Sequence, residues 1–295
     1  MKCFHLRRFG LVLRLDLLSG WKRNLRYVAS LYAGCLAIEF ANFYGPSRNG
    51  LSEHYLRLGE RACPGQPDAA LAAAERGLLA DNAPAFVAFL GFVLTLAASA
   101  AFENLRTKGG RTAYLTLPAT NTEKYLSRLL WATVGAVIAF WIAFVAADVT
   151  RMALFPILGH GYGSTVPYVF HELTHFFSPD GYLNFHMPDA TEYLLGVAFL
   201  AELLLLFHAV YLLCGTLLRR HPYLLTTLGL IALGALTVIL IDLYAQRLER
   251  IPAFDPITLL AVIDGVLFAA IVACYALSYR SFCRIQVLRH KWRRR

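Results

Sequence analysis

Charged residues are scarce in this sequence. Only 16% of its 295 residues are charged and 58% are hydrophobic, whereas a soluble globular domain has about 25% charged and about 45–50% apolar residues. A disordered chain departs from that average in the opposite direction, with low hydrophobicity and high net charge. The shortage of charge therefore excludes an ordinary soluble enzyme and a disordered protein.

Two short signals are also missing. None of the five lysines follows a glycine, so the phosphate-binding loop G-x-x-x-x-G-K-[S/T] is absent. Arg14 and Asp16 interrupt the first apolar stretch, which argues against a cleavable signal peptide. We expect no cofactor bound by this chain.

The apolar residues gather in runs of membrane length. A bilayer core of about 30 Å needs about 20 helical residues, and helices satisfy their own backbone polar groups in lipid. The first run is the least clear of the six, because Glu39 lies inside it. A soluble helical bundle is the alternative, but such a bundle would rarely contain six runs of this kind. We predict an all-α polytopic membrane bundle, a single transmembrane domain over 1–295 with six transmembrane helices. The spans are about 27–43, 84–102, 129–147, 193–217, 223–245 and 257–277.

The basic residues alternate between the segments that flank these runs. Of the 28 lysines and arginines, 21 lie in 1–26, 103–128, 218–222 and 279–295. The positive-inside rule then places both termini in the cytoplasm, with 278–295 as a basic tail. The net charge of +9 is thus a signal of topology in a bacterial inner membrane, and we expect no nucleic acid partner. Only Cys63 of the six cysteines lies outside, which excludes an intrachain disulfide framework there.

Two segments outside the spans predict further helices. Residues 4–20, within the cytoplasmic segment 1–26, carry an apolar stripe beside basic residues, which favours an N-terminal interfacial helix; a simple basic arm is the alternative. In the exterior loop 44–83, residues 69–79 predict a short surface helix. Asp81 or Asn82 is expected to cap the next helix, with Pro84 in its first turn.

The cytoplasmic loop 103–128 is the most informative segment. Gly109-Gly110 predicts a turn and Pro118 a break. Thr120 and Glu123 form a capping box, which satisfies two backbone donors at a helix start. We expect that helix to continue through Lys124 and Arg128 into the third span. A plain positively charged connector is the alternative.

The second exterior loop contains the pattern H-E-x-x-H. On a helix, His171 and His175 share one face and could bind zinc, with Glu172 activating water. The third ligand would be His186 or Glu192. The loop of about 40 residues is small for a protease domain, and an amphipathic helix at the membrane surface explains the pattern equally. We therefore predict no enzyme activity and no metal, and keep a zinc metallohydrolase as an alternative.

Acidic residues lie within or at the edges of the predicted spans. Such groups are costly in lipid and face a bundle interior or a polar path. No Lys or Arg lies in a predicted span core to pair with them. They could line a polar route or lie near the membrane interfaces. We expect Asp148, one turn from Arg151, to lie near an interface. We expect Asp264 to have a role in the interior of the bundle. The intramembrane polar candidates are Glu39, Glu202, Asp242 and Asp264, with Asp148 at an edge.

Residues 105–128, which include Leu117-Pro118-Ala119-Thr120-Asn121 and Glu123-Lys124-Tyr125, resemble a segment LPA(S/T)N-x-EK(F/Y)-x-(S/A)R. Stretches 9–17 and 279–287 also resemble segments of the same proteins. This pattern resembles six-span bacterial membrane proteins similar to permease subunits of type-2 ABC exporters.

The resemblance implies a mechanism. In exporters of this class, an N-terminal interfacial helix and the cytoplasmic loop between the second and third spans contact a separate ATPase subunit. The matching segments are about 4–20 and 104–125. It implies that ATP acts through the partner, and that two permease chains form a homodimer or heterodimer. The expected ATPase-coupling residues are Arg111, Tyr114, Pro118, Thr120, Glu123, Lys124 and Arg128. A membrane scaffold or envelope-stress protein without transport is the remaining alternative.

Overall fold

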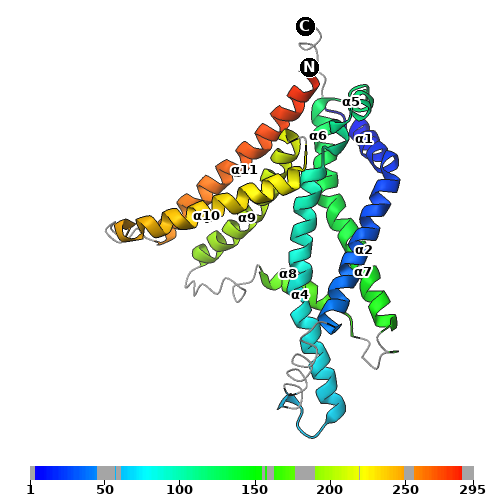
Figure 1. The fold of residues 1–295 in the computed structure, drawn as a ribbon, viewed down its shortest axis with the longest axis vertical. Coiled ribbons are helices and arrows are strands. Elements are labelled where there is room, and N and C mark those ends of the chain that lie inside the picture. The colour runs from blue at the N-terminus through cyan, green and yellow to red at the C-terminus, as the bar shows by residue number, and fades with distance from the viewer. Residues whose placement is uncertain are drawn as a thin grey trace. The chain divides into compact units, whose positions relative to one another are not determined.

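The computed structural model describes residues 4–44, 57, 61–154, 157, 163–176, 190–218, 220–248 and 256–287. About 90% of the structure is helical, and no strand occurs in those residues (Figure 1). The all-α prediction is confirmed. The chain divides into two compact units, which are described separately: unit 1 comprises 1–16, 94–134 and 185–295, and unit 2 comprises 17–93 and 135–184.

Unit 2 is built around the pairing of α2 (Trp21–Tyr44) with α7 (Ala136–Leu154). The part of α4 (Pro67–Ala100) that belongs to this unit adds aromatic packing, with the rings of Phe86 and Phe144 4.6 Å apart. A Cβ on Gly34 would come within 2.8 Å of the Phe89 ring, so glycine allows α2 to pack closely here. The short helix α8 (Val166–Phe176) completes the unit.

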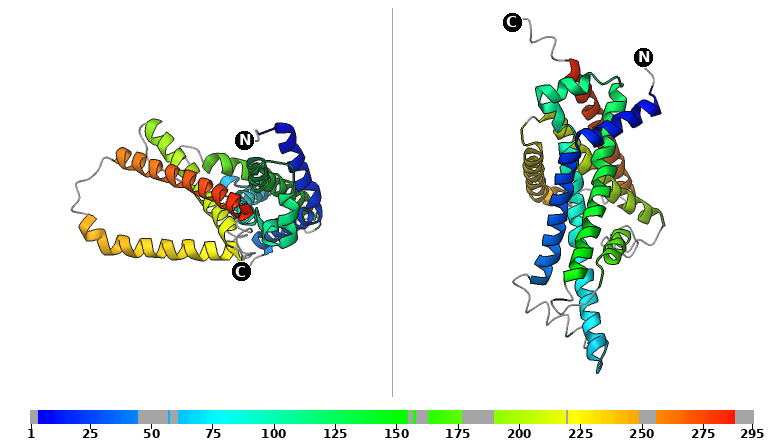
Figure 2. Two further views of the ribbon diagram at one scale, coloured as in Figure 1. Left: turned by 90° about the horizontal axis from the view of Figure 1, so that it is seen from above. Right: turned by 90° about the vertical axis from the view of Figure 1, so that its right-hand side faces the viewer.

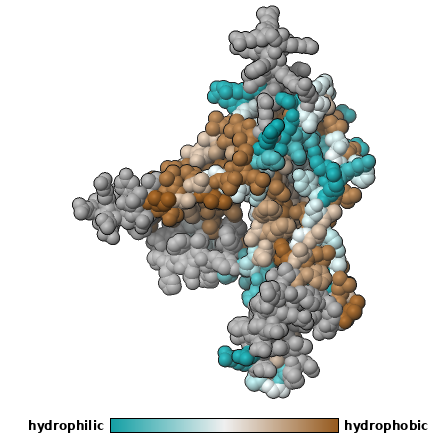
Figure 3. All heavy atoms as spheres, in the orientation of Figure 1, coloured by the Kyte–Doolittle hydropathy of each residue, from teal (hydrophilic) through white to brown (hydrophobic). Residues whose placement is uncertain are grey.

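Unit 1 contains the packed pair α9 (Ala190–Leu217) and α11 (Pro256–Val287), which run side by side in Figure 2, with α10 (Pro222–Leu248) against α9. Its shorter elements are η1 (Glu103–Arg106), α5 (Lys108–Leu115) and α6 (Asn121–Leu130), and it includes most of α1 (Leu6–Ser19). Apolar side chains on α10 and α11 face outward (Figure 3), which suits lipid contact. They include Leu224, Leu228, Ile231, Leu233, Val238, Val262, Val266, Phe268 and Val272.

Five helical stretches of the described residues are long and apolar enough to cross a membrane. They are 72–106, 121–154, 193–217, 222–239 and 260–284, and they match the predicted spans from the second to the sixth. This composition indicates a membrane protein. The first predicted span falls on α2, which is not one of the five, so a sixth span stays a prediction.

The prediction for the start of the second span is wrong. A separate surface helix, a cap at Asp81 or Asn82 and a first turn at Pro84 were expected, but α4 runs unbroken from Pro67 to Ala100 with Pro84 inside. Proline removes one backbone donor from a helix. The neighbouring Asn82, Ala83 and Phe86 are buried, so packing stabilises the helix where local sequence favours an end.

The third span begins as predicted. Helix α6 continues through a π-helical turn, η2 (Trp131–Gly135), into α7. Helix α7 extends to Leu154, seven residues beyond the predicted end of the span, and α11 extends to Val287, so the predicted basic tail begins as helix. The extension of α7 places Arg151 inside the helix, beyond the end of the span that was predicted from the sequence.

Candidate functional site

The start of α6 carries the predicted capping box. The Thr120 hydroxyl accepts a hydrogen bond from the Glu123 backbone N–H at 3.2 Å, and the Glu123 Oε2 accepts one from the Thr120 N–H at 2.8 Å. These two bonds satisfy donors that a helix start leaves unpaired. The prediction for this turn is confirmed.

Glu123 also binds the N-terminal segment of unit 1. Its Oε1 accepts hydrogen bonds from the His5 backbone N–H at 2.8 Å and from Arg8 Nη2 at 3.2 Å. Because the Glu123 side chain is fully buried, each of its oxygens needs such donors. One carboxylate therefore caps α6 and fixes α1 beside it.

A second contact joins the same two helices. Asp16 of α1 forms an ion pair with Arg128 of α6, with Oδ1 and Nη2 2.8 Å apart, and its Oδ2 accepts a hydrogen bond from the Ser127 hydroxyl at 2.8 Å. Asp16 is buried and Arg128 is 11% exposed. With the Glu123 contacts, this pair ties α1 to α6 at two points, about two turns apart along α1 and little more than one turn apart along α6.

Helix α5 packs against α6. The Tyr114 hydroxyl donates to the Lys124 carbonyl at 2.8 Å, and the Arg128 guanidinium lies 4.8 Å from the Tyr114 ring centre. Burial and the negative charge of Asp16 raise the pKa of Tyr114 from 10.0 to about 12. The predicted turn at Gly109-Gly110 is wrong, because both glycines lie in α5. A Cβ on Gly110 would come within 2.2 Å of the Asn104 carbonyl oxygen, so glycine is needed for this close approach.

An aromatic cluster packs against α6 around Tyr125. Tyr125 packs against Phe102 and Phe282, with ring centres 5.6 and 5.7 Å away, and edge-on against Tyr279. The Thr122 hydroxyl lies 2.9 Å from the Tyr279 hydroxyl. The loop between α4 and α6 is therefore a packed helical hairpin and not the plain connector kept as an alternative.

The seven predicted coupling residues have different positions in this hairpin. Tyr114, Glu123 and Lys124 are buried, Arg128 is mostly buried, Arg111 and Thr120 are half-buried, and Pro118 is exposed. Most of them can act on a partner only by holding the hairpin in place. The exposed surface, which we call the α5 face, consists of Gly109, Thr112, Ala113, Thr116 and Pro118. Of these residues, sequence reasoning named only Pro118 as a coupling residue, because the other four are small, uncharged and part of no coupling motif.

The predicted intramembrane acids are divided between the two units. Glu39 in unit 2 pairs with Arg151, 3.2 Å from Nε to Oε2, which corrects the expectation that no basic residue in a span could pair with these acids. In unit 1, Asp264 is 8% exposed, and its carboxylate is near enough to Glu202 for their charges to interact. Neither Asp264 oxygen has a hydrogen-bond partner among the described residues. The side chain of Asp242 lies outside the described residues.

The H-E-x-x-H residues lie on α8, as expected for a helical pattern. The rings of His171 and His175 stack with centres 5.6 Å apart. His186 and the side chain of Glu192 lie outside the described residues, so no third ligand is placed. Within the described part of the chain, no group of three potential ligands comes together.

Comparisons with models of protein families, with curated proteins and with solved structures find no match.

Proposed function

We propose that this protein is the permease-like membrane subunit of an ABC-type exporter and works with a separate ATPase. One observation carries the proposal: the segments that the resemblance assigns to ATPase contact, 4–20 and 104–125, contribute to one hydrogen-bonded assembly in unit 1. The Glu123 contacts that join them are 2.8–3.2 Å long, and Asp16 contacts Ser127 and Arg128, just beyond the second segment, at 2.8 Å.

This assembly suits the transmission of force. The two carboxylates that hold it, Glu123 and Asp16, are buried, and charge-assisted hydrogen bonds are strong and geometrically specific. A partner that displaces α5 would therefore displace α1 and α6 with it. Because α6 continues through η2 into α7, such a movement would reach a helix of membrane length.

The proposal includes the topology. Six spans, cytoplasmic termini and location in a bacterial inner membrane follow from the positive-inside bias of the sequence. Cys63 would then be external and Cys283 internal. A membrane-impermeant maleimide applied to intact spheroplasts should label Cys63 and not Cys283, whereas labelling of Cys283 alone would reverse the orientation.

The α5 face provides a direct test of partner binding. The tagged chain is expressed in its native host, and the ATPase that it retains after purification and the ATP hydrolysis of the purified sample are measured. Thr116→Arg is expected to reduce both by about tenfold, since one lost central contact costs about 1–2 kcal/mol.

Thr174→Arg is the matched control. Thr116 and Thr174 are both exposed, both lie at the end of a short helix, and both hydroxyls donate to the carbonyl three residues earlier, at 2.9 and 2.8 Å. Only Thr116 lies on the α5 face. Equal loss in both variants, or retention in both, would contradict this docking surface, and the absence of any bound ATPase would favour a scaffold.

A further inference from the structure

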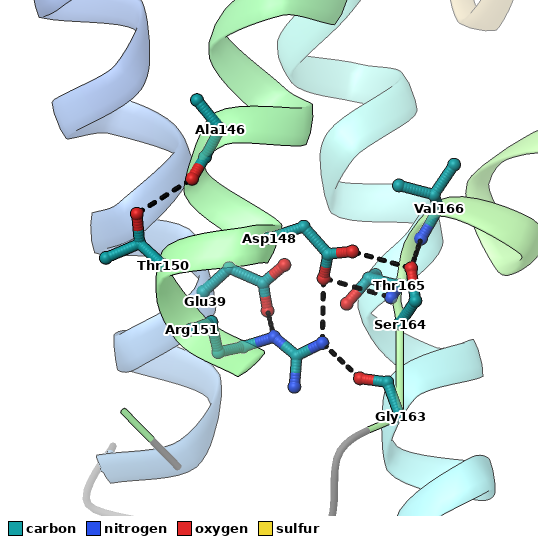
Figure 4. Close-up of polar contacts among 9 residues, drawn as sticks. All are labelled: Glu39, Ala146, Asp148, Thr150, Arg151, Gly163, Ser164, Thr165 and Val166. Atoms are coloured by element: carbon teal, nitrogen blue, oxygen red, sulfur yellow. Dashed lines mark hydrogen bonds and ion pairs between the residues drawn. The ribbon is translucent and has the colours of Figure 1, made fainter. Parts of the chain in front are cut away.

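Unit 2 contains a buried charge cluster that the proposed function does not use. Arg151 of α7 lies between two carboxylates: its Nε is 3.2 Å from Glu39 Oε2 and its Nη2 is 2.7 Å from Asp148 Oδ1 (Figure 4). The three side chains are 0–3% exposed. Among the described residues, the cluster thus has two acids and one base with almost no contact to solvent.

Asp148 has a full set of donors. Besides Arg151, it accepts hydrogen bonds from the Ser164 hydroxyl at 2.6 Å and from the Thr165 backbone N–H at 3.1 Å. The Ser164 hydroxyl in turn accepts the Val166 N–H at the start of α8. Arg151 also donates to the Gly163 carbonyl. Asp148 and Arg151 together therefore hold residues 163–166.

Glu39 has far fewer partners. Its Oε1 has no hydrogen-bond partner among the described residues. In that part of the chain, the cation that lies beside its Oε2 is Arg151. The other groups close to it are Cys35, one turn earlier in α2, the Asp148 carboxylate, and the hydroxyl of Thr165. None of these three adds positive charge.

The charges decide where a proton would bind. Arginine stays protonated in proteins, and Asp148 accepts three hydrogen bonds, one of them from this arginine. A second ionised carboxylate would leave one buried negative charge without a counterion, which is costly in a low-dielectric interior. We propose that Glu39 is a proton-binding site: its carboxyl holds one proton at neutral pH, while Asp148 and Arg151 remain an ion pair.

This assignment also fits the hydrogen bonds. A protonated Glu39 can donate its O–H to the Thr165 hydroxyl oxygen, which lacks another partner among the described residues, while Oε2 stays beside Arg151. Loss of the proton would make Glu39 compete with Asp148 for Arg151. The site therefore links the protonation of α2 to the position of residues 163–166 and to the start of α8.

Infrared spectroscopy of the purified full-length protein in detergent tests the site. The wild-type spectrum at neutral pH should contain the carbonyl stretch of a protonated carboxyl that is missing from Glu39→Gln. Asp148→Asn removes the excess charge and should ionise Glu39, so the same band should disappear. Glu202→Gln is the control and should keep the band, since Glu202 belongs to unit 1.

The pH dependence of thermal unfolding gives a second readout. A folded state that holds one more proton than the unfolded state loses stability as pH rises, by up to about tenfold in the folding equilibrium per pH unit. The wild-type midpoint should fall from pH 6 to pH 9 (roughly the range on either side of neutrality), and Glu39→Gln should remove this part of the slope.

Several results would overturn the proposal. These are a neutral-pH spectrum in which Glu39→Gln removes no protonated-carboxyl band, a band that persists in Asp148→Asn, or equal pH slopes in the wild type and Glu39→Gln. Stabilisation by sodium at constant pH, lost in Glu39→Gln, would assign the site to a metal cation instead. Should Glu39→Gln fail to fold, Glu39→Asp replaces it: the band should shift in frequency in Glu39→Asp, and an unchanged band would overturn the proposal.

Discussion

The ion pairs of α1 and α6 in unit 1 differ from the cluster of α2 and α7 in unit 2 mainly in exposure. Arg8 is 33% and Arg128 is 11% exposed, whereas Arg151 is 1% exposed. Exposed pairs contribute little to stability and rearrange at low cost, but the loss of one partner from a buried pair leaves an uncompensated charge. The Arg8 pair of unit 1 can therefore rearrange at low cost, whereas the Arg151 pairs of unit 2 are fixed.

The largest predicted effect is that of Arg151→Met. It leaves Glu39 and Asp148 buried without their cation, and we expect a loss of about 3–5 kcal/mol in the free energy of unfolding. Denaturant unfolding of the purified protein measures this. The double variant Arg151→Met with Asp148→Asn should recover part of the loss; a single variant as stable as the wild type would show that the cluster is not the fixed contact described above.

Glu123→Ala should have an intermediate effect. It removes the capping box and the acceptor for His5 and Arg8, and loss of a cap alone costs about 1 kcal/mol. We expect a loss of about 1–2 kcal/mol, together with faster protease cleavage of the N-terminal segment. Glu123→Gln, which keeps the capping acceptor and removes the charge, is the control, and an equal loss in both variants would assign the effect to the ion pair alone.

The buried Tyr114 makes the stability of unit 1 sensitive to alkaline pH. Its phenol has a pKa of about 12 in the folded protein and 10.0 without these surroundings. Since the folded state keeps the proton longer, stability is fully present below pH 10.0 and falls as pH rises toward 12. Unfolding measured at successive pH values should show this fall in the wild type, and Tyr114→Phe should reduce it. Identical profiles would mean that the phenol is not buried in the folded state.

Arg8→Met should have the smallest effect. The side chain is one-third exposed, so water and salt already screen its pair with Glu123. We expect a change of at most about 1 kcal/mol, and a smaller one at high salt. A loss as large as that of Arg151→Met would remove the distinction between the two regions.

The sequence predicts local features of this structure well and long-range ones poorly. The capping box of Thr120 and Glu123 depends on residues three apart, so the pattern alone was sufficient. The contact of Glu123 with His5 joins residues 118 apart, and nothing near either residue indicates the partner. The helix expected to begin at Pro84 was placed wrongly because burial, which sequence does not show, stabilises α4 through the proline.

The proximity of Asp148 to Arg151 was noted from the sequence, but the pairing of Arg151 with Glu39 was missed for a related reason. Hydropathy ended the third span at residue 147, and an arginine beyond that point appeared to lie in a loop. Helix α7 continues to Leu154 and brings Arg151 against Glu39. A search for basic residues within two turns of a predicted span end would have detected it.

A photoreactive amino acid placed at Ala113 on the α5 face tests the central claim most directly. The protein is irradiated in native membranes and its cross-linked partner is identified, with the same probe at Thr174 on α8 as the control. The exporter proposal predicts that position 113, and not position 174, cross-links to a protein carrying the loop G-x-x-x-x-G-K-[S/T]. The same products at both positions, or no ATPase at position 113 when the ATPase co-purifies with the chain, would contradict it.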